Sequence, residues 1–245
     1  MKNIIVHIPH ASEHIPSFAI PDYDPDILKQ EKAVMTDKYT DELFLFPCER
    51  VVFPCSRLFC DVERFRDDSM ESMSKIGMGA VYTATSEGEK LRDVTDERKQ
   101  QILREYYDPH HIGLEKSVTA GLKTYGECLI VDGHSFWPDP LPYEPDQSPE
   151  RPDICIGADR FHTPETLVDG LCSFWEENGF STAVNRPYAG ALVPMRFYKK
   201  NRNVQAVMVE INRRLYMQKD GEKSAGFSRM KEMLRKMYFL LRGVY

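Results

Sequence analysis

Two histidines follow short apolar runs of the chain. Asn3–Ile8 (NIIVHI) precedes His10, and Cys128–Val131 (CLIV) precedes His134. Short apolar runs without alternation are typical of strands buried on both faces, and parallel strands present ligand-binding groups at their carboxyl ends. We therefore expect both imidazoles at one sheet edge as metal ligands, with Gly133 letting the backbone turn after the second strand. For either histidine alone, a hydrogen-bonded structural role is the alternative.

Catalytic zinc usually takes three protein ligands, often two histidines and one carboxylate. Two carboxylates are candidates for the third position. Glu13 lies three residues after His10, and Asp37 lies at a possible helix start. The residues alone leave both open, and they indicate Zn²⁺ or another divalent metal as the cofactor.

Glu210 is the most unusual carboxylate of the chain, since it follows the apolar residues Val207–Val209. Burial should raise its pKa, which suits a general base that takes a proton from water. A salt bridge to Arg213 or Arg214 is the alternative. Asp132 could hold the strand-end turn or bind the outer nitrogen of a metal-bound histidine.

Three arginines beside turns, Arg57, Arg64 and Arg196, could bind a substrate carboxylate through their guanidinium forks. Surface ion pairs are the alternative for each. Neither a GxSxG elbow nor a phosphate-binding glycine loop occurs, so covalent catalysis and a nucleotide site have little support.

The elements that must position these residues alternate between strand and helix along 245 residues. This order predicts one three-layer α/β domain over residues 1–245 with a mixed, mostly parallel sheet. Pro109 should end or kink the second helix, Gly126 should stop it, and the proline-rich stretch 138–152 should line or cover a site. Besides the two runs above, we expect strands at 51–54, 58–62, 154–156, 180–185 and 204–211, and helices at 26–46 (with a possible restart at Thr36), 93–124, 163–178 and 226–243.

The composition is that of an ordinary soluble protein. A net charge of −6 and a pI near 5.7 argue against nucleic-acid binding. No apolar stretch approaches the roughly 20 residues that a membrane span needs, and the first residues do not resemble a signal peptide. The six cysteines form no CxxC pair, which favours reduced thiols and a cytoplasmic location. The oligomeric state is left open.

Seven blocks of the chain, in order, resemble the N-formylglutamate amidohydrolase family, which is similar in fold to zinc carboxypeptidases, succinylglutamate desuccinylase and aspartoacylase. The resemblance runs from Ile5 to Met217. It implies a metal-dependent hydrolase of histidine degradation that cleaves the acyl–amine bond of an N-acylated acidic amino acid, with N-formylglutamate as the expected substrate. The blocks are HIPHAS, TDKYTDELF, SRLFCDVERF, YYDPHH, DGHSF, NRPYAG and VEINRRLYM.

The resemblance also assigns the metal ligands. His10 matches the first ligand and His134 the histidine of the DxH motif. The family shares the Asp of the TDKYTDELF block and usually lacks a Glu at the position of Glu13, so Asp37 becomes the preferred third ligand.

For the remaining roles, Glu210 matches the catalytic glutamate and Arg64 the arginine that holds the substrate carboxylate, with Arg57 or Arg196 as helpers. Glu63 departs from the family, which has Asn there. Two other functions stay open: a broader N-acyl amino acid hydrolase or peptidase on the same scaffold, and a non-catalytic carboxylate-binding protein.

Overall fold

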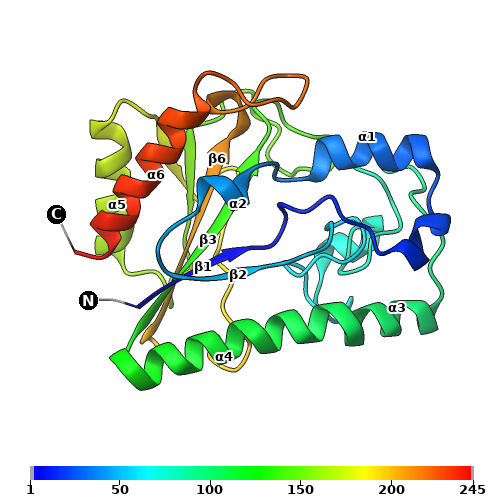
Figure 1. Ribbon diagram of the computed structural model, residues 1–245, viewed down its shortest axis with the longest axis horizontal. Coiled ribbons are helices and arrows are strands. Elements are labelled where there is room, and N and C mark those ends of the chain that lie inside the picture. Colours follow the sequence, from blue (N-terminus) through cyan, green and yellow to red (C-terminus); the bar gives the residue numbers. More distant parts are fainter. Residues whose placement is uncertain (1–2, 244–245) are drawn as a thin grey trace.

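A computed structural model describes residues 3–243 and contains one six-stranded sheet (Figure 1). The strand order is β2-β1-β3-β6-β4-β5. The first four strands in this order run parallel, β4 is antiparallel to β6, and β5 is parallel to β4. The prediction of an α/β fold with a mixed, mostly parallel sheet is confirmed. The strands are β1 (Asn3–Ile8), β2 (Glu49–Val52), β3 (Cys128–Phe136), β4 (Ile154–Gly157), β5 (Thr182–Val184) and β6 (Val204–Asn212).

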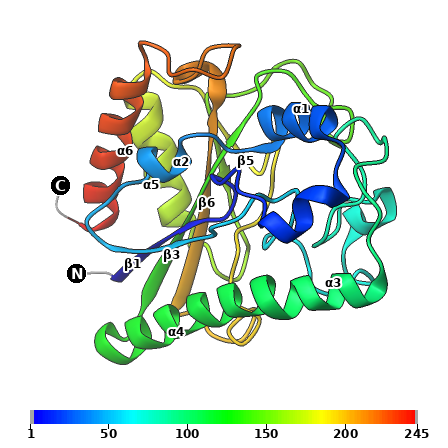
Figure 2. The same ribbon diagram turned by 45° about the vertical axis from the view of Figure 1, so that its right-hand side comes forward.

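Helices cover both faces of the sheet (Figures 1 and 2). Helices α5 (Glu165–Glu177) and α6 (Phe227–Leu241) pack with the short α2 (Thr40–Leu43) against one face, where they share a core with Val6 and Val131. Helix α4 (Asp108–Tyr125) covers the other face. Because side chains alternate along a strand, neighbouring residues of the central strands are buried against different helices.

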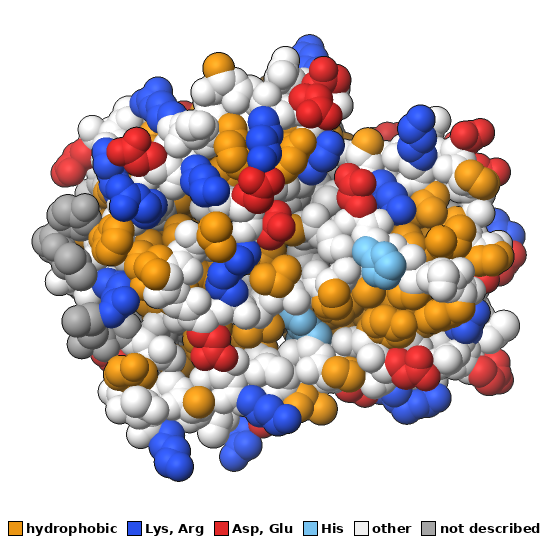
Figure 3. Space-filling model, in the orientation of Figure 1, with side chains coloured by type: hydrophobic (Ala, Val, Ile, Leu, Met, Phe, Trp, Pro, Cys, Tyr) orange, Lys and Arg blue, Asp and Glu red, His pale blue; other side chains and the backbone are white. Residues whose placement is uncertain are grey.

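A second apolar core lies beyond the carboxyl ends of β1 and β2. It gathers loop residues around α1 (Pro25–Met35) and α3 (Asp96–Ile102), together with the 3₁₀ helices Ser17–Asp22 and Ser72–Ile76. Figure 3 shows apolar side chains at the surface over this region. Within residues 3–243, no helix is long and apolar enough to cross a membrane.

The helix predicted at 93–124 is continuous but irregular. The Thr95 side chain accepts a hydrogen bond from the amide of Arg98 and caps the start. A π-helical turn, Leu103–Tyr107, comes directly before Pro109 and absorbs the irregularity that proline imposes. Gly126 ends α4 with a left-handed φ of 78°.

The prediction of a strand at Leu58–Val62 was wrong. These residues form tight turns, in which the Ser56 carbonyl accepts hydrogen bonds from the amides of Phe59 and Cys60. They are nevertheless fully buried in the second core. The apolar run therefore indicated burial correctly and extended backbone incorrectly.

The single helix predicted at 26–46 is two helices, α1 and α2. The chain leaves α1 at Thr36 and enters α2 through Tyr39, whose φ of 70° is left-handed. The Thr36 hydroxyl does not cap the second helix, since it has no hydrogen-bond partner among the described residues. This break places Asp37 outside both helices.

Strand β3 extends beyond the predicted turn and ends at Phe136. Gly133 therefore does not turn the chain. A Cβ at this position would lie 2.8 Å from the Ile8 side chain and 2.9 Å from the Phe44 ring. Glycine is needed here because α2 and β1 approach the strand closely.

Candidate metal centre

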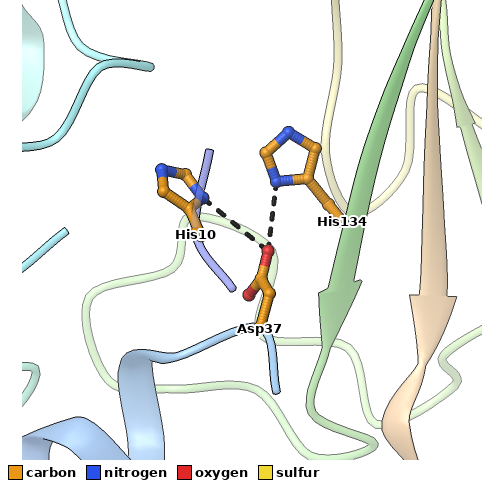
Figure 4. A group of neighbouring side chains, drawn as sticks. All are labelled: His10, Asp37 and His134. Carbon is orange, nitrogen blue, oxygen red and sulfur yellow. Dashed lines mark hydrogen bonds and ion pairs between the residues drawn. The ribbon is translucent and has the colours of Figure 1, made fainter. Parts of the chain in front are cut away.

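Three side chains meet at one wall of a cavity at the carboxyl ends of β1, β3 and β6. His10 lies two residues after β1, His134 lies within β3, and Asp37 lies between α1 and α2. The Nδ1 atoms of both histidines face Asp37 Oδ2, at 3.7 Å for His10 and 3.1 Å for His134 (Figure 4). All three residues are buried.

Backbone hydrogen bonds hold Asp37 in this place. Its amide donates to the carbonyl of His10 at 3.0 Å, which ties the break between α1 and α2 to the end of β1. The Thr40 hydroxyl donates to the Asp37 carbonyl at 2.8 Å. The third residue of the cluster is therefore fixed by contacts between segments that are distant in the sequence.

Two further carboxylates, those of Asp61 and Asp132, orient the histidines. Asp61 Oδ1 lies 2.8 Å from Nε2 of His10, and Asp132 Oδ1 lies 3.1 Å from Nε2 of His134. Carboxylates in this position fix the rings of metal-bound histidines and raise their basicity. Asp132 therefore contacts the outer nitrogen of His134, which was one of the two roles considered for it. Asp61 was not singled out, although it lies in the SRLFCDVERF block.

Asp37, which lies between the two histidines, and Asp61, which lies behind His10, both have lowered pKa values and are therefore ionised. Burial would raise the pKa of Asp37, but the neighbouring imidazoles of His10 and His134 and the charge of Arg213 bring it well below its usual range. For Asp61, the charges of Arg57 and His10 outweigh burial in the same way, and its pKa is lowered. Anionic carboxylates are the form that binds a cation.

The donor set fits a divalent metal. Two imidazoles and one carboxylate lie with their ligand atoms within 4.8 Å of one another. The Nδ1 atom of His10 is buried and has no hydrogen-bond partner among the described residues, so it is available to a ligand. This combination of nitrogen and oxygen donors is common in catalytic zinc sites.

Glu210 lies beside the metal cluster. The register of β3 and β6 pairs His134 directly with Glu210, so both side chains project to the same side of the sheet. Burial, opposed by the charge of His134 and reinforced by that of Asp37, raises the pKa of Glu210 to about 8. Its Oε2 atom has no hydrogen-bond partner in the described part of the chain.

The alternative of a salt bridge from Glu210 to a following arginine was wrong. Arg213 donates to Asp37 Oδ1 at 3.0 Å, and Arg214 donates to Asp153 at 2.9 Å. Sequence reasoning did not place Arg213 in the site, although it is buried there and its guanidinium lies over the Trp137 ring.

The three arginines proposed as carboxylate ligands differ in their surroundings. Arg57 lines the cavity but donates two hydrogen bonds to Asp61. Arg64 lines the cavity, and its Nε is buried without a hydrogen bond, with Asp61 Oδ2 3.9 Å away. Arg196 does not line the cavity and pairs at the surface with Glu115. The structure therefore separates Arg196 from the other two.

The cavity has a volume of about 240 Å³. Leu141, Tyr143 and Glu144 of the proline-rich stretch form part of its wall, as expected for 138–152, and Tyr188 lies beside them. The alternative metal ligand Glu13 is exposed and lies outside this cavity. Asp37 is the carboxylate that meets the two histidines.

A second buried cluster lies behind the first. His7 Nδ1 is 2.8 Å from Asp132 Oδ1 and 3.1 Å from Glu63 Oε1, while Nε2 is 2.8 Å from Nε2 of His110. No pattern in the sequence singled out His7 or His110. Asp132 belongs to both clusters, since it also orients His134.

Comparisons with known proteins identify the family and support the fold. A family model described as N-formylglutamate amidohydrolase matches residues 2–217. An N-formylglutamate amidohydrolase from Ralstonia eutropha JMP134 has a similar structure, with a TM-score of 0.82 and 20% identity over 100% of this chain and 96% of the other. A gene product of Agrobacterium tumefaciens aligns with a TM-score of 0.67 and 20% identity over 98% and 92% of the two chains. A search of curated proteins gave no match.

Proposed function

Since this chain belongs to the N-formylglutamate amidohydrolase family, we propose that it is a metal-dependent hydrolase of N-acyl amino acids. Water adds to the acyl carbon, the C–N bond breaks, and a carboxylic acid and a free amine are released. N-formylglutamate is the substrate that the family description names. The convergence of His10, Asp37 and His134 beside the unpaired carboxylate of Glu210 carries the proposal.

His10, Asp37 and His134 would hold the metal, with Zn²⁺ the ion best suited to these donors. A bound divalent ion would polarise the acyl carbonyl and lower the pKa of water. Asp61 and Asp132 keep the two imidazole rings oriented. Arg213 balances the buried charge of Asp37.

Glu210 is the proposed general base. It accepts a proton from the attacking water and returns one to the leaving amine. A carboxylate with a raised pKa performs both transfers well, because its two protonation states lie close in free energy near neutral pH. No other carboxylate lining the cavity both pairs with a ligand histidine in the sheet register and keeps an unpartnered oxygen among residues 3–243.

Arg64 is the proposed anchor for the substrate carboxylate. Three arginines line the cavity: Arg57, Arg64 and Arg213. Of these, only Arg64 makes no side-chain hydrogen bond to another described residue. A buried guanidinium with open donors is matched by a carboxylate, which it can bind through two parallel hydrogen bonds. This contact would hold the scissile bond at the metal cluster.

The test combines metal analysis with an amidase assay. We expect the purified protein to hydrolyse N-formylglutamate or another N-formyl amino acid, to lose activity with a chelator and to regain it with Zn²⁺. Glu210→Gln should retain the metal and lose roughly 10²–10⁴-fold in turnover. Unchanged turnover would exclude Glu210 as the base. Metal-loaded protein without activity on any N-acyl amino acid would favour a carboxylate-binding protein instead.

A further inference from the structure

A second pocket opens directly beside the proposed catalytic cavity. It has a volume of about 260 Å³ and shares Glu63, Arg64, Ala189 and Met208 with the cavity. We call it the side-chain pocket. Its apolar wall is formed mainly by Phe65, Leu192, Val193, Met195, Tyr198 and Met208.

The position of Arg64 indicates which part of a substrate would enter this pocket. In an N-acyl amino acid, the carboxylate and the side chain are attached to the same carbon atom. A carboxylate bound by Arg64 therefore brings the side chain to the boundary that Arg64 forms between the two pockets. The acyl group lies toward the metal cluster, on the other side of the scissile bond.

Apart from Glu63 and Arg64 at the boundary, three polar side chains that line the side-chain pocket are already engaged. The Tyr107 hydroxyl donates to the Arg64 carbonyl at 2.8 Å, and Nε2 of His111 lies 3.0 Å from the Val62 carbonyl. Asp132 is bound to His7. What the pocket offers to a ligand is therefore mostly apolar surface.

The charges at the boundary disfavour a second carboxylate. Arg64 is the only lysine or arginine among the described residues that line the side-chain pocket, and the substrate's first carboxylate uses it. Glu63 places a carboxylate at the same boundary. Lys200 lies outside the lining and donates to the Met195 carbonyl. A glutamate side chain that entered the pocket would find no cation to pair with, and its carboxylate would be repelled by that of Glu63.

We propose that the side-chain pocket binds an uncharged, apolar amino acid side chain, so that the preferred substrates are N-formyl derivatives of residues such as leucine and methionine. This inference rests on the proposed function and narrows it. Burying the side chain in the apolar pocket strengthens binding, whereas a second carboxylate would lose hydration without gaining a partner.

The first test compares kcat/KM for N-formyl derivatives of leucine, methionine, glycine and glutamate with the Zn²⁺-loaded protein. We expect leucine and methionine to exceed both glycine and glutamate by roughly ten-fold or more. A higher kcat/KM for N-formylglutamate would overturn the apolar pocket but leave the hydrolase intact. Activity toward none of the four would refute the proposed function itself.

The second test changes the charge of the pocket. Met195 is 55% exposed at its rim, so Met195→Lys should fold normally and supply the missing cation. We expect the leucine-to-glutamate ratio of kcat/KM to fall by ten-fold or more. Met70→Lys is the matched control, because Met70 is 56% exposed and lines neither pocket. An unchanged ratio in Met195→Lys, or an equal change in both variants, would contradict the proposal.

Glu63→Gln gives an independent measurement on the same boundary. Removal of the negative charge should raise kcat/KM for N-formylglutamate relative to N-formylleucine several-fold. If the ratio stays unchanged in a variant that folds and still cleaves N-formylleucine, Glu63 does not select against a second carboxylate.

Discussion

Two neighbouring clusters of this protein combine histidines with carboxylates, and they differ in whether a histidine nitrogen is left without a hydrogen-bond partner in the part of the chain that the structure describes. His10, Asp37 and His134 form one cluster, and His7, Glu63 and Asp132 form the other. In each, the ligand atoms lie within 4.8 Å of one another. The first lines the cavity with a buried imidazole nitrogen of His10 that has no hydrogen bond.

In the second cluster, both ring nitrogens of His7 are engaged. Nδ1 lies between the carboxylates of Asp132 and Glu63, and Nε2 lies against His110. Burial alone would lower the pKa of His7, but the two carboxylates outweigh it and raise the pKa to about 9. Burial would also lower the pKa of His134, but Asp132 and Asp37 raise it well above its ordinary value, so protonation does not separate the two clusters. The two clusters therefore differ in their imidazoles: both ring nitrogens of His7 are engaged, whereas Nδ1 of His10 has no hydrogen-bond partner among the described residues.

The largest expected effect follows from removing the inner carboxylate. Asp37→Asn keeps a hydrogen-bond acceptor for Arg213 but removes the charge that would bind the metal. We expect metal affinity to fall by more than the roughly 100-fold that loss of an outer partner can cost, and activity to fall with it. Glu13→Gln should retain both. Metal titration of the two variants checks this, and metal loss in Glu13→Gln alone would reverse the assignment.

A smaller effect is expected at Asp132, the residue that both clusters share. Asp132→Asn should weaken metal binding by roughly 10–100-fold, because the ring of His134 loses its charged partner. Asp153→Asn is the matched control, since Asp153 pairs with Arg214 outside the cavity. Equal metal affinity in the wild type and Asp132→Asn would show that the two clusters are independent.

Substitution of His7 should change metal affinity least, but it should alter how the stability of the protein depends on pH. His7 has a higher pKa in the folded state than the ordinary 6.5, so the stabilisation it gives is fully present below pH 6.5 and is lost as the pH rises through about 9. For the metal-free wild type, this corresponds to a loss of about 3 kcal/mol in the free energy of unfolding across that range.

Denaturant unfolding at several pH values with a chelator measures this loss. His7→Asn should show a smaller decrease in stability with pH than the wild type. His162→Asn is the control, since His162 is buried but bonded to the backbone at Val204 and Lys199. If His7→Asn has the same pH dependence as the wild type, His7 is not the charged group of the second cluster.

The apolar pattern of the sequence was enough to predict the central strands and several residues of the candidate site. The apolar runs before His10 and around Val131 and Val209 correctly indicated β1, β3 and β6, and the structure brings His10, His134 and Glu210 to one cavity. These strands could be predicted because a short apolar run without alternation indicates burial, and in these three places the buried segment is a strand of the sheet. The family resemblance then favoured Asp37 over Glu13 as the proposed third ligand.

Which polar groups are paired and which are open depends on how the chain folds in three dimensions. Asp61, Arg213 and the cluster around His7 are joined to the site by contacts across 51 to 176 positions of the chain, which no local pattern records. The run at Leu58–Val62 folded into turns because burial, not extension, is what its apolar residues require. Arg57 and Arg196 are paired with carboxylates of the protein, whereas Arg64 is not hydrogen-bonded to any carboxylate within residues 3–243. Whether an arginine is free to bind a substrate depends on its neighbours in space.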